Sequence, residues 1–224
     1  MEGRYPDSIM LTLASCSDTE RLTEWLDWYS RIHTPDITEG GIFNNMIRFL
    51  NTETNHEGRQ VANLSECGFK DPYAALKELR EIRAPYRDDN RQSPYTKIYG
   101  QEGPMVKISG EFQYVKNAPV RGIYIENISL TDPDQLRAFN YWYNDTHIPA
   151  LLNTKLFQSA YRYRGLHPDG PLDTFVCIYE TDREDPDEAI TEAKELASYK
   201  LTGFEALKLN WNMTAKRIWP LEGR

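Results

Sequence analysis

The chain has 224 residues, a formal net charge of −8 at neutral pH and a pI near 5.1. An acidic chain without a basic patch or stripe does not fit a nucleic-acid-binding protein. No apolar run approaches the roughly 18–20 residues that a membrane span needs, and the N-terminus lacks the apolar core of a signal peptide. The three cysteines are widely spaced without a CxxC pair, so neither a disulfide framework nor a zinc site is indicated. We therefore expect a cytoplasmic chain with no membrane or nucleic-acid partner.

The chain repeats part of its own sequence at a constant offset of 114 positions. A Trp-Tyr-x-x-x-His-x-Pro segment occurs at 28–35 and again at 142–149. Internal repetition of this length predicts two similar structural units, which we place at 1–118 and 119–224. Further identities at the same offset pair Asp18 with Asp132, Leu22 with Leu136, Phe43 with Phe157, Arg48 with Arg162 and Glu66 with Glu180.

The two units predict the same elements in the same order. Asp18 and Asp132 are suitable helix N-caps, and Pro35 and Pro149 are expected to end the first helix of each unit. The first unit should contain a strand at 9–13, a helix from 22, strands at 43–49 and 61–66, a helix at about 72–84 and a last strand within 95–116. The second should contain strands at 123–125, 157–163, 175–180 and 209–219, with helices from 136 and at 186–198.

This order, β-α-β-β-α-β twice, is that of the ferredoxin-like motif. An alternating run at 106–115 predicts an extra edge strand or hairpin at the end of the first unit. The predicted fold class is α+β: two tandem ferredoxin-like repeats whose antiparallel sheets pack face to face into an intrachain pseudo-dimeric α+β barrel. We expect that barrel to enclose an apolar chamber.

The repeated motif could carry proton-transfer chemistry. Tyr29 and His33 are four residues apart on a helix, as are Tyr143 and His147, so each pair shares a face. Histidine is suited to act as a general base at neutral pH, and tyrosine can orient or protonate a substrate oxygen. The alternative is structural, because a histidine near a helix end can bond a terminal carbonyl there.

Acidic and aromatic neighbours of the motif are further candidates. Asp36 and Asp145 lie close enough in sequence to fix a histidine tautomer. Trp28 and Trp142 could contact a ligand, although packing in the core is favoured for both.

Two arginines recur on the second strand of each unit. Arg48 and Arg162 could hold an acidic ligand group bidentately. Salt bridges to Glu66 and Glu180 are favoured, because both partners recur in both units.

Tyr124 and Glu126 share one face of a strand, opposite Ile123 and Ile125. If the isoleucines face the helices, Tyr124 and Glu126 face the barrel interior. A carboxyl group buried there would have a raised pKa and could act as an acid or base. The alternative is a solvated barrel mouth.

The motif residues resemble those of a known superfamily. The segment 142–152, followed by Phe157 and by Tyr161-Arg162-Tyr163, is similar to the dimeric α+β barrel superfamily and most similar to its EthD-like members. The first unit repeats the pattern at 28–35, Phe43 and Arg48. Gly40-Gly41 precede the motif Phe in the first unit, but residues 154–156 of the second contain no glycine, so the resemblance implies two unequal pockets.

The resemblance implies an enzyme with a pocket on each sheet and a catalytic motif histidine, His33 or His147. We expect a cofactor-independent cyclase, dehydratase or decarboxylase of an apolar, aromatic or polyketide-like substrate. In it Tyr29 or Tyr143 is the orienting acid, and no metal or organic cofactor takes part. Two alternatives stay open: a monooxygenase of this superfamily, cofactor-free or haem-bearing, and a hydrophobic-ligand-binding protein of the stress-response type. Pairing of the pseudo-dimer into a homodimer also stays open.

Overall fold

The computed structural model describes residues 1–53, 58–67, 71, 74, 77–78, 80–81, 91–108, 118–165, 174–197 and 203–221. Strand β1 (Ser8–Cys16) opens the first half and leads through a 3-10 turn at Thr19–Arg21 into the helical run. The remaining described elements of this half are α1 (Leu22–Trp28), a π turn (Tyr29–His33), α2 (Thr34–Thr38), β2 (Phe43–Asn51), β3 (Val61–Cys67) and β4 (Thr96–Lys107).

The second half begins with the same elements, shifted by 114 positions, and also has a described helix between its last two strands. It contains β5 (Gly122–Leu130), α4 (Leu136–Trp142), a π turn (Tyr143–His147), α5 (Ile148–Leu152), β6 (Ser159–Gly165), β7 (Thr174–Thr181), α6 (Pro186–Leu196) and β8 (Leu207–Trp219). The predicted strands and the helix at 186–198 are confirmed. The predicted helix at 72–84 lies largely outside the described residues, as does the edge strand at 106–115 beyond residue 108.

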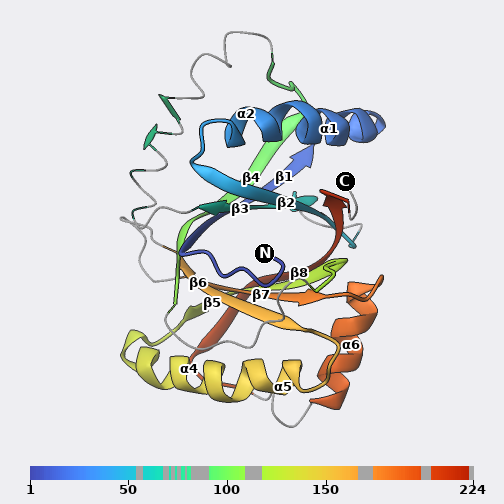
Figure 1. The fold of residues 1–224 in the computed structure, drawn as a ribbon. Coiled ribbons are helices and arrows are strands. Elements are labelled where there is room, and N and C mark those ends of the chain that lie inside the picture. Colours follow the sequence, from blue (N-terminus) through green and yellow to red (C-terminus); the bar gives the residue numbers. More distant parts are fainter. Residues whose placement is uncertain are drawn as a thin grey trace.

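The strands form one closed antiparallel barrel in the order β1-β3-β2-β8-β5-β7-β6-β4. The β4-β1-β3-β2 arrangement of the first half is followed by β8-β5-β7-β6 of the second. Edge strands of the two halves pair with each other at two seams, β2 with β8 and β4 with β6. Figure 1 shows the resulting layers, with α1 and α2 on one side of the barrel and α4, α5 and α6 on the other. The α+β barrel prediction is confirmed at this level.

The prediction that Pro35 and Pro149 end their helices is wrong. The helical run continues past each proline as α2 and α5, because a π turn precedes it. In this turn the Thr34 N–H donates to the Tyr29 carbonyl, and the Ile148 N–H donates to the Tyr143 carbonyl. The wider turn accommodates a proline ring that would clash inside a regular α-helix.

The barrel interior is packed with side chains and is not a ligand chamber. Ile123 and Ile125 belong to this interior core, whereas Tyr124 belongs to the cluster between the sheet and the helices. The expected orientation of Tyr124 and Glu126 is therefore reversed, because alternate residues of a strand face opposite sides. Other interior residues include Ile9, Leu11, Leu13, Ile47, Phe49, Leu64, Tyr161, Tyr163, Val176 and Ile178.

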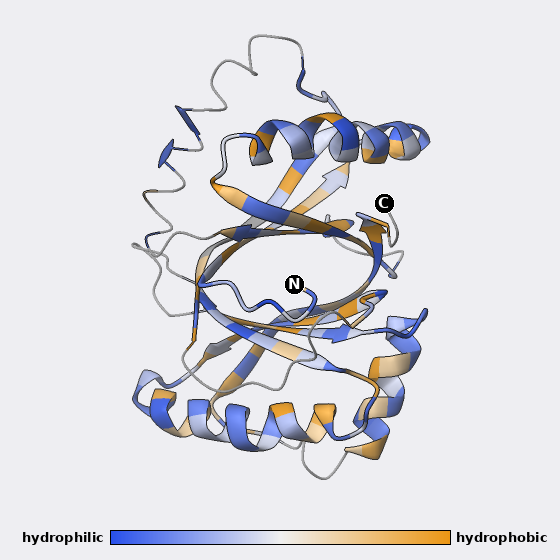
Figure 2. Ribbon diagram, viewed as in Figure 1, coloured by the Kyte–Doolittle hydropathy of each residue, from blue (hydrophilic) through white to orange (hydrophobic). Residues whose placement is uncertain are grey.

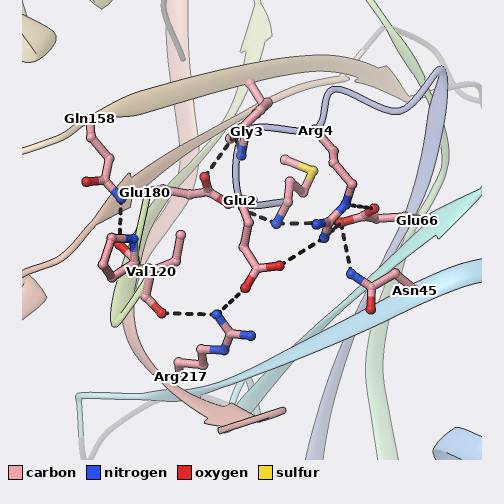
Figure 3. A network of polar contacts seen from close by, with 12 residues as sticks. Glu2, Gly3, Arg4, Asn45, Glu66, Val120, Gln158, Glu180 and Arg217 are labelled. Atoms are coloured by element: carbon pink, nitrogen blue, oxygen red, sulfur yellow. Dashed lines mark hydrogen bonds and ion pairs between the residues drawn. The ribbon is translucent and has the colours of Figure 1, made fainter. Parts of the chain in front are cut away.

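Glu66 and Glu180 lie inside the barrel, and the N-terminal segment neutralises them (Figure 3). The ammonium group of Met1 is 2.9 Å from Glu180 Oε1 and 3.6 Å from Glu66 Oε1. The Arg4 guanidinium donates two bonds of 2.9 Å to the Glu66 carboxylate. The expected salt bridges from Arg48 and Arg162 to these glutamates are absent from the described residues. Both arginines face the helices, the side of the sheet opposite to the glutamates.

The helices on both sides of the barrel are amphipathic, with hydrophobic and hydrophilic residues intermixed along each (Figure 2). Trp25 of α1 and Phe139 of α4 are buried against the sheet. Within the described part of the chain, no helix is both long enough and apolar enough to cross a membrane. Each half has a cavity between the sheet and these helices, and a further polar cavity is lined by the N-terminal segment, β2 and β3.

Candidate functional site

A cavity of about 450 Å³ lies between the sheet and the helices of the second half. Its floor is made by β5 and β8, and its walls by α4, the following π turn, α5 and α6. Most of the lining is apolar or aromatic, with Glu126, His147, Lys194 and Asn212 as the polar groups. The other lining residues are Tyr124, Ile128, Trp142, Leu151, Gly203, Phe204, Leu207 and Leu209.

Glu126 is the centre of the polar contacts at this cavity. Its Oε1 accepts a hydrogen bond of 3.0 Å from the Tyr124 hydroxyl. Its Oε2 accepts a bond from the Tyr143 hydroxyl and lies 3.1 Å from His147 Nε2. The four side chains are buried, with Glu126 only 7 % exposed and His147 only 8 % exposed. This arrangement brings together four residues that the sequence nominated from two separate segments.

These contacts fix the charge of the cluster. Burial alone would raise the pKa of Glu126, but the charge and hydrogen bond of His147, with the bonds from Tyr143 and Tyr124, lower it to about 2. Burial and the neighbouring Glu126 charge raise the pKa of the Tyr143 hydroxyl well above its usual value. Glu126 is therefore an ionised acceptor and Tyr143 a neutral donor. The predicted raised pKa of Glu126 is wrong, because hydrogen-bond donors surround the carboxylate.

The π turn sets the position of the histidine. Tyr143 begins the turn and His147 ends it, and their ring centroids are 4.6 Å apart. The Trp142 ring centroid is 5.1 Å from that of His147 and 5.9 Å from that of Tyr143, so the three rings pack on one another. Nδ1 of His147 is buried and has no hydrogen-bond partner among the residues that the structure describes. The imidazole thus packs on two aromatic side chains and pairs its Nε2 with a carboxylate.

A second, smaller cavity of about 280 Å³ occupies the matching place in the first half. Trp28, Tyr29 and His33 line it, and the Trp28 and His33 rings are stacked 5.1 Å apart. Thr12 stands where the second half has Glu126, so His33 has no equivalent carboxylate on the sheet. The expectation of two unequal pockets agrees with this difference.

The predicted arginines lie behind the cavities and do not line them. Arg48 donates to Ser30, to Asn63 and to the Leu26 carbonyl. Arg162 donates to Asn144, and its guanidinium lies 4.4 Å from the centroid of the Tyr143 ring. Burial lowers the pKa of Arg48 to about 10. Each arginine therefore holds the helical run that carries the Trp-Tyr-x-x-x-His-x-Pro motif of its half against the sheet. Neither lines a cavity.

The two aspartates also have roles other than those expected. Asp36 forms a bidentate pair with Arg91, at 3.0 and 2.6 Å. Asp145 is exposed and lines neither cavity. The residue that orients His147 is Glu126, which is far from it in sequence but adjacent through the sheet.

Sequence reasoning did not nominate Lys194, Phe204, Leu207 or Asn212 as cavity residues. Lys194 Nζ lies 4.8 Å from the centroid of the Tyr124 ring. The alternation of Leu207 and Leu209 marked one face of the last strand, but the sequence did not show which element would cover that face. The described residues contain no group of three or more His, Cys, Asp or Glu placed to bind a metal ion through protein ligands alone.

No protein-family model matches the chain, and no curated protein matches its sequence. Solved structures do match its fold. TA0507, described as a chlorite dismutase, has a TM-score of 0.58 at 14% identity and covers 94% of each chain. A dye-decolorizing peroxidase from Bacteroides thetaiotaomicron has a TM-score of 0.58 at 5% identity, covering 96% of this chain and 94% of its own. A variant of DypB from Rhodococcus jostii RHA1, in complex with haem, has a TM-score of 0.57 at 6% identity, covering 95% and 93%.

These neighbours agree with a dimeric α+β barrel fold, and the EthD-like resemblance stays a prediction. The function predicted first, a cofactor-independent cyclase, dehydratase or decarboxylase, is contradicted. One neighbour is described as a chlorite dismutase and one as a dye-decolorizing peroxidase, and the DypB variant was solved with haem. The comparison points to the haem-bearing form of the alternative that the sequence left open, a monooxygenase that is either cofactor-free or haem-bearing.

Proposed function

We propose that this chain is a haem-dependent oxidoreductase whose active site is at the cavity of the second half. The observation that carries the proposal is the His147 imidazole at the wall of an apolar cavity. Its Nε2 is paired with the Glu126 carboxylate, and its Nδ1 is buried without a partner in the described part of the chain. The fold of the haem-containing neighbours supports the same choice.

The residues present fit a haem in their donor chemistry. A histidine that ligates a metal characteristically pairs its other nitrogen with a carboxylate, which fixes the ring and raises its basicity. Histidine is also the ligand that holds haem iron in peroxidases. His147 would hold the iron, and the haem when bound would supply one-electron and oxygen chemistry.

Each remaining residue of the site has a task that follows from its position. Glu126 orients His147, and the hydroxyls of Tyr124 and Tyr143 fix the carboxylate in turn. Trp142 and Phe204, whose rings are 5.8 Å apart, cover the cavity and exclude water. Lys194 is the cation among the lining residues and would bind an acidic group of the cofactor or substrate.

We also propose that residues 1–118 and 119–224 are two copies of one ancestral unit. The offset of 114 positions between the first strands and first helices of the two halves supports this origin, as does the pairing of the two halves edge to edge. The second copy carries the oxidoreductase site because it alone combines the motif histidine with the carboxylate at position 126.

Haemin titration of the purified chain tests the function. We expect a Soret band that saturates at one haem per chain, together with peroxide-dependent oxidation of a phenolic dye. His147→Ala should abolish the band or shift it to that of a weakly held haem, whereas the matched variant His33→Ala should leave it unchanged. Absence of a saturable Soret band in the wild-type protein would rule the proposal out and favour a ligand carrier.

A further inference from the structure

The two cavities differ at four sheet positions that correspond by the 114-residue offset and by strand register. In the first half Thr12 is paired across the sheet with Asn63, and Met10 with Ser65. In the second half the same register pairs Glu126 with Cys177 and Tyr124 with Tyr179. The first half therefore carries small or flexible side chains where the second carries two tyrosines and a glutamate.

These four sequence differences change the position of the cavity between the sheet and the helices. In the second half the rings of Tyr124, Phe157 and Tyr179 pack on one another, with centroid separations of 5.9 Å from Tyr179 to each of the other two. They fill the inner part of the space between the sheet and α5. In the first half Met10 and Ser65 leave that part open, so the cavity reaches Phe43 and Met46. The first-half cavity is consequently a deep pocket and not a reduced copy of the other.

A fixed segment closes the first-half pocket on its outer side. Residues Gln92, Ser93, Thr96 and Ile98 line the cavity from this segment. The Arg91–Asp36 pair ties it to α2, and the Trp28 indole N–H donates to the Arg91 carbonyl at 3.0 Å. The Trp25 indole N–H donates to the Thr96 hydroxyl at 2.8 Å. Contacts from both α1 and α2 thus hold this wall in place.

The lining of this pocket is neutral. Apart from His33, none of the lining residues that the structure describes has a side chain that ionises near neutral pH. The side-chain amide of Asn63 already accepts a hydrogen bond from Arg48 and donates one to the Thr12 carbonyl. The hydroxyls of Thr12 and Ser65 make no hydrogen bond within the described residues, so they are available to a ligand. Burying an ionised group there would cost far more than burying a hydroxyl group that finds a partner.

We infer that the first-half cavity is a second small-molecule site, separate from the oxidoreductase site, which takes a neutral compound of one or two rings carrying a hydroxyl group. An apolar cavity of about 150 Å³ accommodates benzene, and this cavity, at about 280 Å³, is nearly twice as large. Trp28 and Phe43 provide aromatic faces for the rings, while Thr12 and Ser65 bond the hydroxyl. The site stands on the first-half residues and does not depend on haem.

Binding of 1-naphthol to the full chain tests this inference. Calorimetry and the quenching of tryptophan fluorescence measure the binding. We expect saturable binding of one naphthol per chain, and binding of the anion 1-naphthoate at least tenfold weaker. Ser65→Tyr, which introduces the second-half residue, should weaken naphthol binding at least tenfold. The matched variant Leu207→Trp, which fills the second-half cavity, should leave it unchanged.

Circular dichroism establishes that each variant is folded. If Ser65→Tyr fails to fold, the conservative double change Thr12→Val with Ser65→Ala removes both hydroxyls at nearly constant volume and should weaken naphthol binding three- to tenfold. No saturable binding by the wild-type chain overturns the inference. So does unchanged binding by the folded first-half variants, or loss of binding in Leu207→Trp. Failure of haemin to give a Soret band would overturn the proposed function but would leave the naphthol result as it is.

Discussion

At the scale of single residues, Glu126 organises the second-half site. A buried carboxylate is stable only when donors surround it, and Glu126 has Tyr124, Tyr143 and His147 around it. The sequence identified all four residues as candidates. It could not show their assembly, because the donors come from β5 and from a turn 17–21 residues further along the chain. For the same reason the direction of the Glu126 pKa shift was predicted wrongly.

The lowered pKa of Glu126 makes stability depend on pH in a defined direction. Since the pKa falls from 4.5 to about 2 on folding, the stabilisation is complete above pH 4.5 and is lost as the pH falls towards 2. Converted at 1.36 kcal/mol for each pKa unit, the loss reaches about 3 kcal/mol. Urea unfolding across this window should show that loss in the wild-type protein and in Glu184→Gln, an exposed control. Glu126→Gln should be less stable at neutral pH and should lack this pH-dependent contribution. An equally steep loss of stability on acidification in Glu126→Gln would contradict the assignment of an ionised Glu126.

At the scale of elements, the π turns distinguish this chain from a regular helical pattern. Periodicity and the N-cap aspartates located the helices, and alternating residues located the strands, because both signals depend on neighbours within a few positions. The continuation past Pro35 and Pro149 depends instead on a single widened turn. That turn has no recognised sequence signal, although it places Tyr143 and His147 side by side.

The seam between β4 and β6 contains three paired positions and is reinforced by one tyrosine. The Tyr5 hydroxyl donates to the Arg162 carbonyl at 2.7 Å and accepts from the Arg162 N–H at 3.1 Å. Tyr5→Phe leaves the Arg162 N–H without this acceptor, while the Arg162 carbonyl keeps the bond from the Ile108 N–H at 3.1 Å. We therefore expect a loss of about 1–3 kcal/mol in the free energy of unfolding. Tyr141→Phe, a change at an exposed tyrosine, should cost less than about 0.5 kcal/mol. Equal stability of the two variants in urea would show that Tyr5 does not support the seam.

At the scale of the whole molecule, the repeat predicted the barrel because each ferredoxin-like sheet leaves one face uncovered. It did not predict that this interior would be packed solid, or that Glu66 and Glu180 would face it. The alternation of residues along a strand divides them between two faces, but it does not show which face packs against the helices. The two cavities consequently lie between the outer faces of the sheet and the helices. The sequence predicted the motif residues as part of a site but did not predict Lys194, Phe204 or Asn212.

The buried glutamates tie the N-terminal segment to both halves of the barrel (Figure 3). Glu180 accepts from the Met1 ammonium, the Glu2 N–H and the Tyr161 hydroxyl. Glu180→Gln removes the nearer of the two counter-charges of the buried Met1 ammonium and leaves Glu66 at 3.6 Å, which should destabilise the fold by about 3 kcal/mol. Glu184→Gln removes an exposed pair with Arg121 and should cost less than about 1 kcal/mol. Thermal unfolding of both variants measures the difference, and similar melting temperatures would exclude a role for Glu180 in stability.

Whether this chain holds haem iron on His147 is tested most directly by anomalous diffraction from crystals of the haemin complex at the iron edge. The proposed function predicts one strong peak per chain, in the second-half cavity and within bonding distance of the His147 imidazole. A peak beside His33, a peak away from both cavities, or crystals grown with haemin that show no iron would contradict it.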